Sequence, residues 1–177
     1  MRCKWAEQND LECKYHDEEW GMPVRDSPKL FEKLCLEGAQ AGLSWDIILK
    51  KREDYRRAFH GFDVETVAKM TDEELDNILK TANVVKNRLK VYSVRANAIA
   101  ALEIMKNRDF SDYLWSFVGG SPIDNARKSQ SDIPDLTDYS EKMSKDLKEH
   151  GFKFVGPTIC YAFMQSMGMV NDHVANC

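Results

Sequence analysis

The sequence predicts an all-α protein. Apolar residues recur at helical spacing along most of the 177-residue chain. Residues that favour helix starts, such as Ser, Asp and Thr, stand just before several of these segments. The chain has no internal repeat and no low-complexity tract, and its length suits one domain or a tight pair of subdomains. We therefore expect a single unit over residues 1–177, built from two closely packed helical subdomains.

The first long helix follows an irregular N-terminal segment. Residues 1–25 are predicted to be irregular, with Gly21 and Pro23 as breakers. A helix is predicted to begin at Ser27-Pro28, because Ser caps helices and Pro suits the first helical position. Gly42 can end this helix. Its inward face is predicted to carry Leu30, Phe31, Leu34, Cys35 and Ala41.

Four further helices are predicted before a long connection. Ser44 caps the next helix, Asp63 starts a short one, and residues 71–74 (TDEE) form a capping-box pattern that opens another. A long helix is expected over residues 87–107. Residues 119–136 contain turn formers and little periodicity, so they predict a long surface connection.

The last folded element is predicted to be two helices joined by a hairpin, over about residues 138–168. Met143 and Leu147 share one face of the first helix, and Gly151 can end it in a left-handed conformation. Residues 152–156 (FKFVG) form a compact hairpin. A second helix then opens at Pro157-Thr158, and Gly168 can end it.

Composition limits the class of protein. A net charge of −4 argues against a general polyanion binder. The five cysteines lack the spacing of a secreted disulfide scaffold, and the N-terminus lacks an apolar signal segment. No apolar run approaches the roughly 20 residues of a membrane span. We expect a soluble cytoplasmic protein, with thiols that are free or bound to metal.

Two basic runs are candidates for local nucleic-acid contact. Residues 80–95 carry five basic residues with no acid between them, and residues 50–57 carry five against two acids. Such runs are usually just solvated faces. Here they flank the Glu37 segment and the hairpin in an otherwise acidic chain, which favours a small electrostatic footprint.

Four potential metal ligands stand at the two ends of the chain: Cys3, His16, His173 and Cys177. Together they form a Cys₂His₂ set, which is a ligand set that structural zinc uses. Such a site would fasten termini that are otherwise usually frayed. The separation between His16 and His173 fits no zinc-finger template. From spacing alone, a core Cys3, a solvated His16 and an incidental terminal pair are an equally good explanation.

Glu37 is the candidate functional carboxylate. It lies three residues after Leu34, on the apolar face of its helix, where an unpaired charge is costly. The break at Gly42 presents Leu43 and Trp45 just beyond it. Aromatic walls around a carboxylate suit a planar or cationic ligand, and an apolar residue on a tight turn suits a wedge between stacked bases. The alternative is a helix-end Glu that is capped or faces water.

The hairpin between Gly151 and Gly156 is a candidate phosphate site. The N-terminus of the following helix favours an anion, and Lys153 adds a positive charge. A phosphate could bind there without any sequence readout. An ordinary helix–helix connection is the commoner explanation in all-α proteins, so both interpretations stay open.

Four stretches of the chain resemble the 3-methyladenine DNA glycosylase I family. Residues 15–21 (YHDEEWG) are similar to its N-terminal signature, and residues 35–45 (CLEGAQAGLSW) to its active-site stretch. Residues 151–161 (GFKFVGPTICY) and 170–173 (VNDH) are similar to its C-terminal half. The resemblance covers essentially the whole chain, and motifs of this length are specific.

The resemblance implies a bacterial helix-hairpin-helix glycosylase of base-excision repair. Such a protein would be a monomer that acts on alkylated double-stranded DNA and releases free 3-methyladenine, with one structural zinc and no membrane partner. The positions it assigns are Glu37 for catalysis, Tyr15, Trp20 and Trp45 for base binding, Gly42 and Leu43 for a DNA-plugging turn, and Cys3, His16, His173 and Cys177 for zinc. With the hairpin as phosphate anchor, we add Lys153 and Gly156 as DNA contacts. Glu12 departs from the pattern, where some members have an aromatic residue, so no pocket contact is expected from it.

The catalytic power expected of this protein is modest. A glycosylase takes its base out of the stack, and N3-methylated adenine is cationic and already a good leaving group. Many relatives in the wider superfamily place an aspartate after the hairpin, whereas residues 156–161 (GPTICY) contain no acid. We therefore expect Glu37 to recognise the cationic base and not to act as an obligatory general base.

The main alternative is a non-catalytic, zinc-stapled DNA-binding module. A zinc hydrolase is disfavoured because four protein ligands leave no open metal position.

Overall fold

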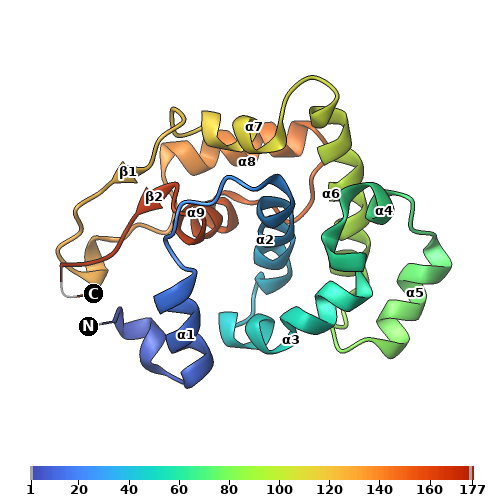
Figure 1. Ribbon diagram of the computed structural model, residues 1–177, viewed down its shortest axis with the longest axis horizontal. Coiled ribbons are helices and arrows are strands. Elements are labelled where there is room, and N and C mark those ends of the chain that lie inside the picture. The colour runs from blue at the N-terminus through green and yellow to red at the C-terminus, as the bar shows by residue number, and fades with distance from the viewer. Residues whose placement is uncertain (1, 176) are drawn as a thin grey trace.

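The computed structural model describes residues 2–175 and 177 and has a mostly helical fold (Figure 1). Two-residue strands β1 (Ile123–Asp124) and β2 (Val170–Asn171) pair in parallel, and short 3₁₀ turns cover Lys4–Glu7, His60–Phe62 and Gln130–Asp132. The all-α prediction is confirmed at this level. The helices are α1 (Asp10–Glu18), α2 (Ser27–Gln40), α3 (Trp45–Ala58), α4 (Val64–Ala68), α5 (Asp72–Thr81), α6 (Arg88–Met105), α7 (Phe110–Ser116), α8 (Asp138–Glu149) and α9 (Pro157–Ser166).

Helix α2 lies at the centre of the molecule. It packs against α3, α6 and α9, and Figure 1 shows it between the α4–α6 side and the α7–α9 side. Its residues 33–39 are all buried, as expected for a helix surrounded by others. Phe31 makes edge contacts with Phe62 on one side and Phe110 on the other, at centroid distances of 6.4 and 6.5 Å. One hydrophobic core therefore runs through both sides of the fold.

The N-terminal segment is more regular than the sequence predicted. Residues 1–25 were expected to be irregular, but α1 occupies Asp10–Glu18 and begins at an Asn9 cap whose side chain accepts from the Glu12 N–H. Its residues are mostly charged or polar, so apolar periodicity gave no signal. Helix α7 was also missed. It has seven residues and begins at an Asp109 cap that accepts from the Asp112 N–H.

The other predicted helices are confirmed with small changes at their ends. Asp26 caps α2 in place of Ser27, whose hydroxyl instead accepts from the Ser111 N–H at 3.0 Å. The capping box at Thr71 opens α5. Gly151 and Gly168 follow α8 and α9, as predicted, with φ of +96° and +68°. The left-handed conformation predicted for Gly151 is confirmed, and Gly168 shares it. Across the described residues, no helix combines the length and apolarity that a membrane crossing requires.

The two ends of the chain meet. Figure 1 shows both termini at one side of the molecule, next to α1 and the loop after β1. The Cα atoms of Cys3 and Cys177 are 4.5 Å apart. The approach is fixed by β2, which pairs with β1, and by the Ala175 N–H, which donates to the Arg127 carbonyl oxygen at 3.0 Å.

Candidate active site

A cavity of about 340 Å³ opens between α1, α2, the start of α3, α9 and the loop at residues 130–135. This size is within the range of small-ligand sites. Four of the residues that the sequence singled out lie together in its wall, although they come from three separate segments. The lining consists of Trp5, Tyr15, Trp20, Glu37, Gln40, Trp45, Gln130, Ile133, Pro134, Asp135, Thr158, Tyr161, Ala162 and Gln165.

Glu37 supplies a buried carboxylate to this cavity. The residue is 4% exposed, because the C-terminal half of α2 is covered by α9 and α3. Its nearest charged partner is Lys33, one turn earlier on α2, with Nζ 3.9 Å from Oε1. Burial raises the pKa of Glu37, and the Lys33 ammonium opposes that shift. The prediction that Glu37 faces inward is therefore confirmed, and the alternative of a solvated helix-end residue is wrong.

Aromatic rings form the walls. The rings of Tyr15 and Trp45 lie 5.5 Å apart, and Trp5 contacts Trp20 edge-on at 5.2 Å. Burial raises the pKa of Tyr15 well above its usual value, so its hydroxyl stays protonated at neutral pH. Within the described residues, the indole nitrogen of Trp45 is the buried side-chain polar atom without a hydrogen-bond partner. An unpaired buried donor beside aromatic faces suits a planar ligand with an acceptor at its edge.

Lys33 is a functional candidate that the sequence interpretation missed. The residue is 6% exposed. The ammonium lies over the rings of Trp45 and Tyr15, 4.0 and 4.3 Å from their centroids, and contacts the Tyr15 hydroxyl. Lysine is rarely buried, so composition gave no warning. The i, i+4 spacing from Glu37 was the available signal.

Gly42 and Leu43 lie on a tight turn between Gln40 and Trp45, which both line the cavity. Gly42 is exposed with φ of +77°, and a Cβ there would meet nothing within 4 Å. Leu43 is half-exposed, and its N–H donates to the Gln40 carbonyl oxygen at 2.7 Å. The Gln40 side-chain amide donates back to the Leu43 carbonyl oxygen at 2.5 Å. The turn therefore presents a leucine on a backbone that is held from both directions.

The turn between α8 and α9 is hydrogen-bonded to α6 and contacts α2. Asn97 of α6 accepts from the Lys153 N–H at 2.8 Å and donates to the Lys153 carbonyl oxygen at 3.2 Å, while the Lys153 side chain stays exposed. A Cβ on Gly38 would lie only 3.0 Å from the Phe154 carbonyl oxygen, so α2 and this turn are in direct contact. Gly156, the N-cap of α9, has open space beside it.

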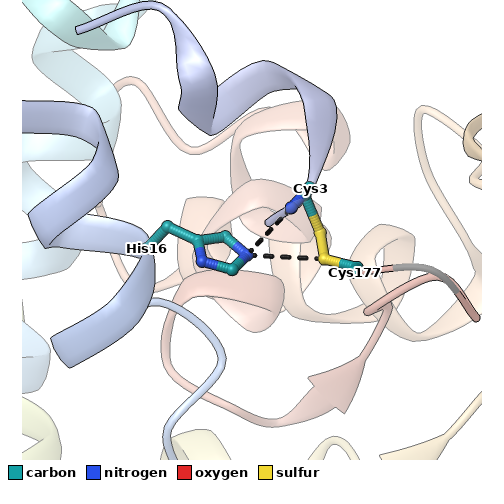
Figure 2. A group of neighbouring side chains, drawn as sticks. All are labelled: Cys3, His16 and Cys177. Atoms are coloured by element: carbon teal, nitrogen blue, oxygen red, sulfur yellow. Dashed lines mark hydrogen bonds between the residues drawn. A yellow bond between two sulfur atoms is a disulfide. The ribbon is translucent and has the colours of Figure 1, made fainter. Parts of the chain in front are cut away.

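Three of the four predicted metal ligands form one cluster, which Figure 2 shows. The donor atoms of Cys3, His16 and Cys177 all lie within 4.8 Å of one another, and Nε2 of His16 is 3.4 Å from Sγ of Cys177. The structure joins the two cysteines as a disulfide. A disulfide and a zinc site would use the same two sulfurs, so they are alternative states of this cluster.

His173 lies beside the cluster but not within it. Its ring meets that of His16 edge-on at 5.5 Å, and its Nδ1 is 2.9 Å from Oδ1 of Asn171. Both histidines pack on the cavity residue Trp20, with His16 stacked at 5.8 Å and His173 edge-on at 4.7 Å. The terminal cluster therefore supports one wall of the cavity.

The donor set fits a zinc ion. Nδ1 of His16 is 3.0 Å from Oδ1 of Asp17, which directs Nε2 toward the two sulfurs. A metal-bound histidine commonly makes such a bond through its second nitrogen. Two sulfurs and two imidazoles from separate segments are also the ligand types that structural zinc takes.

Asp172 is a second residue whose role only the structure reveals. It is 1% exposed, and it accepts from Arg127 Nε at 3.0 Å and Gln165 Nε2 at 2.9 Å, as well as from the Tyr161 hydroxyl. Burial opposes its ionisation, but these hydrogen bonds outweigh it and hold the pKa below the usual value. Because Gln165 and Tyr161 line the cavity, Asp172 fixes the part of the wall that α9 supplies.

The remaining polar wall comes from Gln130 and Asp135, in the loop expected to be a surface connection, and from Thr158. Nothing in the local sequence pattern marks them, because the loop reaches the cavity only through the folding of the chain. Glu12 does not line the cavity. It is buried against Asn9, whose side-chain amide donates to it at 3.2 Å.

The fold and the cavity define a mostly helical protein with a base-sized, aromatic pocket around a buried carboxylate. Residues 5–177 match the model of the methyladenine glycosylase family, and the chain belongs to this family.

Similar proteins align with this chain over nearly its full length. The DNA-3-methyladenine glycosylase 1 of Escherichia coli (strain K12) is 49% identical over 99% of this chain and 95% of its own. A crystal structure of a 3-methyladenine DNA glycosylase I superposes with a TM-score of 0.98 at 48% identity, covering 100% of this chain and 98% of that one. A structure from Staphylococcus aureus, described as the basis of 3-methyladenine recognition, has a TM-score of 0.96 at 38% identity, covering 99% and 94%.

Proposed function

We propose that this protein is a DNA-3-methyladenine glycosylase, which hydrolyses the N-glycosidic bond of 3-methyladenine in alkylated DNA during base-excision repair. The observation that carries the proposal is the Glu37 carboxylate, buried in an aromatic cavity of about 340 Å³. The family membership and the relatives named for this activity support the same function.

The cavity residues account for recognition of a methylated, cationic adenine. The faces of Tyr15 and Trp45 attract a positive planar ring. Glu37 accepts from the exocyclic amine and offsets the charge, while the Trp45 indole N–H offers a donor to a ring nitrogen. Since the base leaves readily once bound, these residues need only hold it and its sugar in place while water attacks. Neutral normal bases lack the charge that the pocket selects.

The direct test is incubation with methylated duplex DNA, followed by chromatographic identification of the released base. Release of 3-methyladenine is expected. Binding to alkylated DNA without release in a single turnover would instead identify a non-catalytic binding module.

For DNA engagement, we propose that the α8–turn–α9 unit acts as a helix-hairpin-helix phosphate anchor and that Leu43 fills the space left by the flipped base. Support comes from the exposed Lys153 side chain, the free approach at Gly156 and the contact between Gly38 and Phe154. That contact links the anchor to the helix that carries Glu37 and ends at the leucine turn. The anchor, the plug and the pocket would therefore move as one body.

Replacing Leu43 with Ala is expected to reduce excision from duplex DNA by about tenfold, because an apolar wedge offsets an unstacking cost of a few kcal/mol. Excision from a single-stranded methylated oligonucleotide should change little, since that base is already unstacked. The measurement is single-turnover release from both substrates. Met105→Ala, which truncates another partly exposed apolar side chain at the end of α6, is the matched control. Equal losses on both substrates would contradict the wedge role.

We also propose that Cys3, His16, His173 and Cys177 hold one structural zinc in a reducing bacterial cytoplasm. The supporting observations are the convergence of three of the donors, the Asp17 bond to His16 and the position of His173 beside them. When bound, the zinc would fasten the termini and support Trp20, with no part in the reaction.

Chelation under reducing conditions is expected to lower the Tm by about 5–15 °C, equivalent to a few kcal/mol for a chain of this size. Metal analysis of fresh protein should give one zinc per chain, and Cys177→Ser should abolish it. Cys13→Ser changes a free, partly buried thiol outside the cluster and serves as the control. Metal-free protein with an intact Cys3–Cys177 disulfide would show that the disulfide is the native state of the cluster.

A further inference from the structure

A buried lysine stands directly behind the base pocket. Lys33 does not appear among the described residues that line the cavity, yet its ammonium reaches three residues that do. These are Glu37, with Oε1 at 3.9 Å, and the faces of Trp45 and Tyr15, at 4.0 and 4.3 Å from the ring centroids. The function proposed above assigns Lys33 no role.

The charges around Lys33 leave Glu37 as its counter-ion. Glu19, next to α1, is paired with Arg52 of α3 at 2.7 Å. Glu32, on α2, is paired with Arg56 at 2.7 Å. These two acids are therefore largely neutralised by partners of their own.

Lys33 already contacts the carboxylate and the two aromatic rings that a cationic base would contact. A methylated adenine in the cavity would bring a second positive charge to the same carboxylate and the same two rings. Like charges at such distances in a buried site repel strongly, and the usual response is the loss of one proton. Lys33 is the group that can lose one, because the charge of an N3-methylated nucleoside is permanent.

We propose that Lys33 sets the charge of the pocket: it is the counter-ion of Glu37 in the free protein, and a cationic base displaces that charge by driving the Lys33 proton into solvent. In this step one ammonium N–H bond breaks, the electron pair stays on Nζ, and the proton passes to the buffer. The neutral amine can accept a hydrogen bond from the Tyr15 hydroxyl, so the contact survives in both states. The proposal rests on the base-recognition function above and names Lys33 as a positioning residue.

The protonation equilibrium of Lys33 suits this role. Burial lowers the pKa of Lys33 to about 8, and the carboxylate of Glu37 opposes the shift. The ammonium therefore predominates at pH 7 and the amine at pH 9. If the cation binds only when Lys33 is neutral, the affinity of the protein for the cation should rise about tenfold from pH 7 to pH 9. The reason is that the neutral fraction of Lys33 falls about tenfold for each pH unit below its pKa.

Calorimetric titration of the whole protein tests the proposal. The probe is 3,9-dimethyladeninium, a fixed cation that matches the charge of the methylated nucleoside, with neutral adenine as the control ligand. At pH 7, comparing buffers of different ionisation enthalpy should show release of nearly one proton with the cation and none with adenine. Affinity for the cation should rise about tenfold by pH 9.

Two substitutions separate charge from packing. Lys33→Met keeps the length of the side chain and removes the charge, so it should bind the cation about tenfold more tightly than wild type at pH 7 and lose the rise toward pH 9. Lys33→Arg keeps a charge at every pH tested and should bind weakly with no rise. Lys33→Arg should also release no proton.

Three results would overturn the proposal: no proton release by wild type, the wild-type pH profile retained in Lys33→Met, or weaker cation binding by Lys33→Met at every pH. If Lys33→Met does not fold, the wild-type proton count and Lys33→Arg still decide. Wild-type release of 3-methyladenine from methylated DNA, measured in parallel, distinguishes failure of this inference from failure of the proposed function.

Discussion

Replacing Glu37 with Gln is expected to weaken binding of 3-methyladenine by about 1–3 kcal/mol, the scale of a hydrogen bond to a charged group. The amide keeps the shape of the side chain but removes the charge that offsets a cationic base. The loss of affinity should be larger for the 3,9-dimethyladeninium cation than for neutral adenine. Titration calorimetry with these two ligands measures the difference, and excision of the methylated base should fall with the affinity for the cation.

The same substitution also affects the fold, because Lys33 loses its counter-ion. Removing one partner of a buried pair is costly, although Lys33 can limit the cost by releasing its proton. Adding Lys33→Met to Glu37→Gln should therefore recover thermal stability without recovering affinity for the cation. Glu103→Gln, on an exposed side chain of α6, is the control and should change neither property. Unchanged affinity of Glu37→Gln for both ligands would exclude a recognition role.

Replacing Gly168 with Ala is expected to destabilise the protein by about 2–5 kcal/mol, the sum of overpacking and left-handed backbone costs. Gly168 has φ of +68°, and a Cβ there would lie 2.4 Å from the nitrogen of Pro23 and 2.5 Å from the carbonyl carbon of Met22. The neighbouring backbone would have to move. That segment is bound to the end of α9 by Gly21 and Val24, whose N–H groups donate to Ser166 and Met167.

Gly61→Ala is the matched control for this substitution. Gly61 has a similar φ of +65° but open space around it, so its replacement should cost only the left-handed backbone term of about 1–2 kcal/mol. Chemical denaturation of both variants gives the two free energies of unfolding. Because residues 21–24 follow Trp20, Gly168→Ala should also weaken base binding at temperatures where it remains folded. Equal stability losses in the two variants would show that packing at Gly168 is not decisive.

Much of the helical framework could be read from local sequence. Capping residues and apolar spacing predicted α2, α3, α4, α5, α6, α8 and α9, because those signals act within a few residues. Helices α1 and α7 were missed, since α1 has mainly polar residues and α7 is short. In both, the N-cap was present, but a cap alone is too common to predict a helix without apolar periodicity.

The residues of the candidate site also divide into those that the sequence identified and those that only the structure identified. Glu37, Tyr15, Trp20 and Trp45 were found from their residue types and from long family-like motifs, and the structure brings them into one cavity. Lys33 and Asp172 were not found. A lysine or an aspartate in a helical or terminal segment is usually exposed, and only the packing around each shows it to be buried and engaged.

The sequence by itself determined where most helices begin and end, which carboxylate faces inward, and which four residues at the two ends could share a metal. The helix boundaries and the inward face depend on neighbours along the chain, whereas the four end residues were recognised from their residue types and from the family resemblance. The tertiary structure alone decided that Trp20 packs against His16 and His173, that Gly168 must stay small beside Pro23, and that a second buried charge stands behind Glu37. The physical reason is that burial, ion pairing and steric contact depend on residues far apart in sequence, and the folded chain alone brings these together.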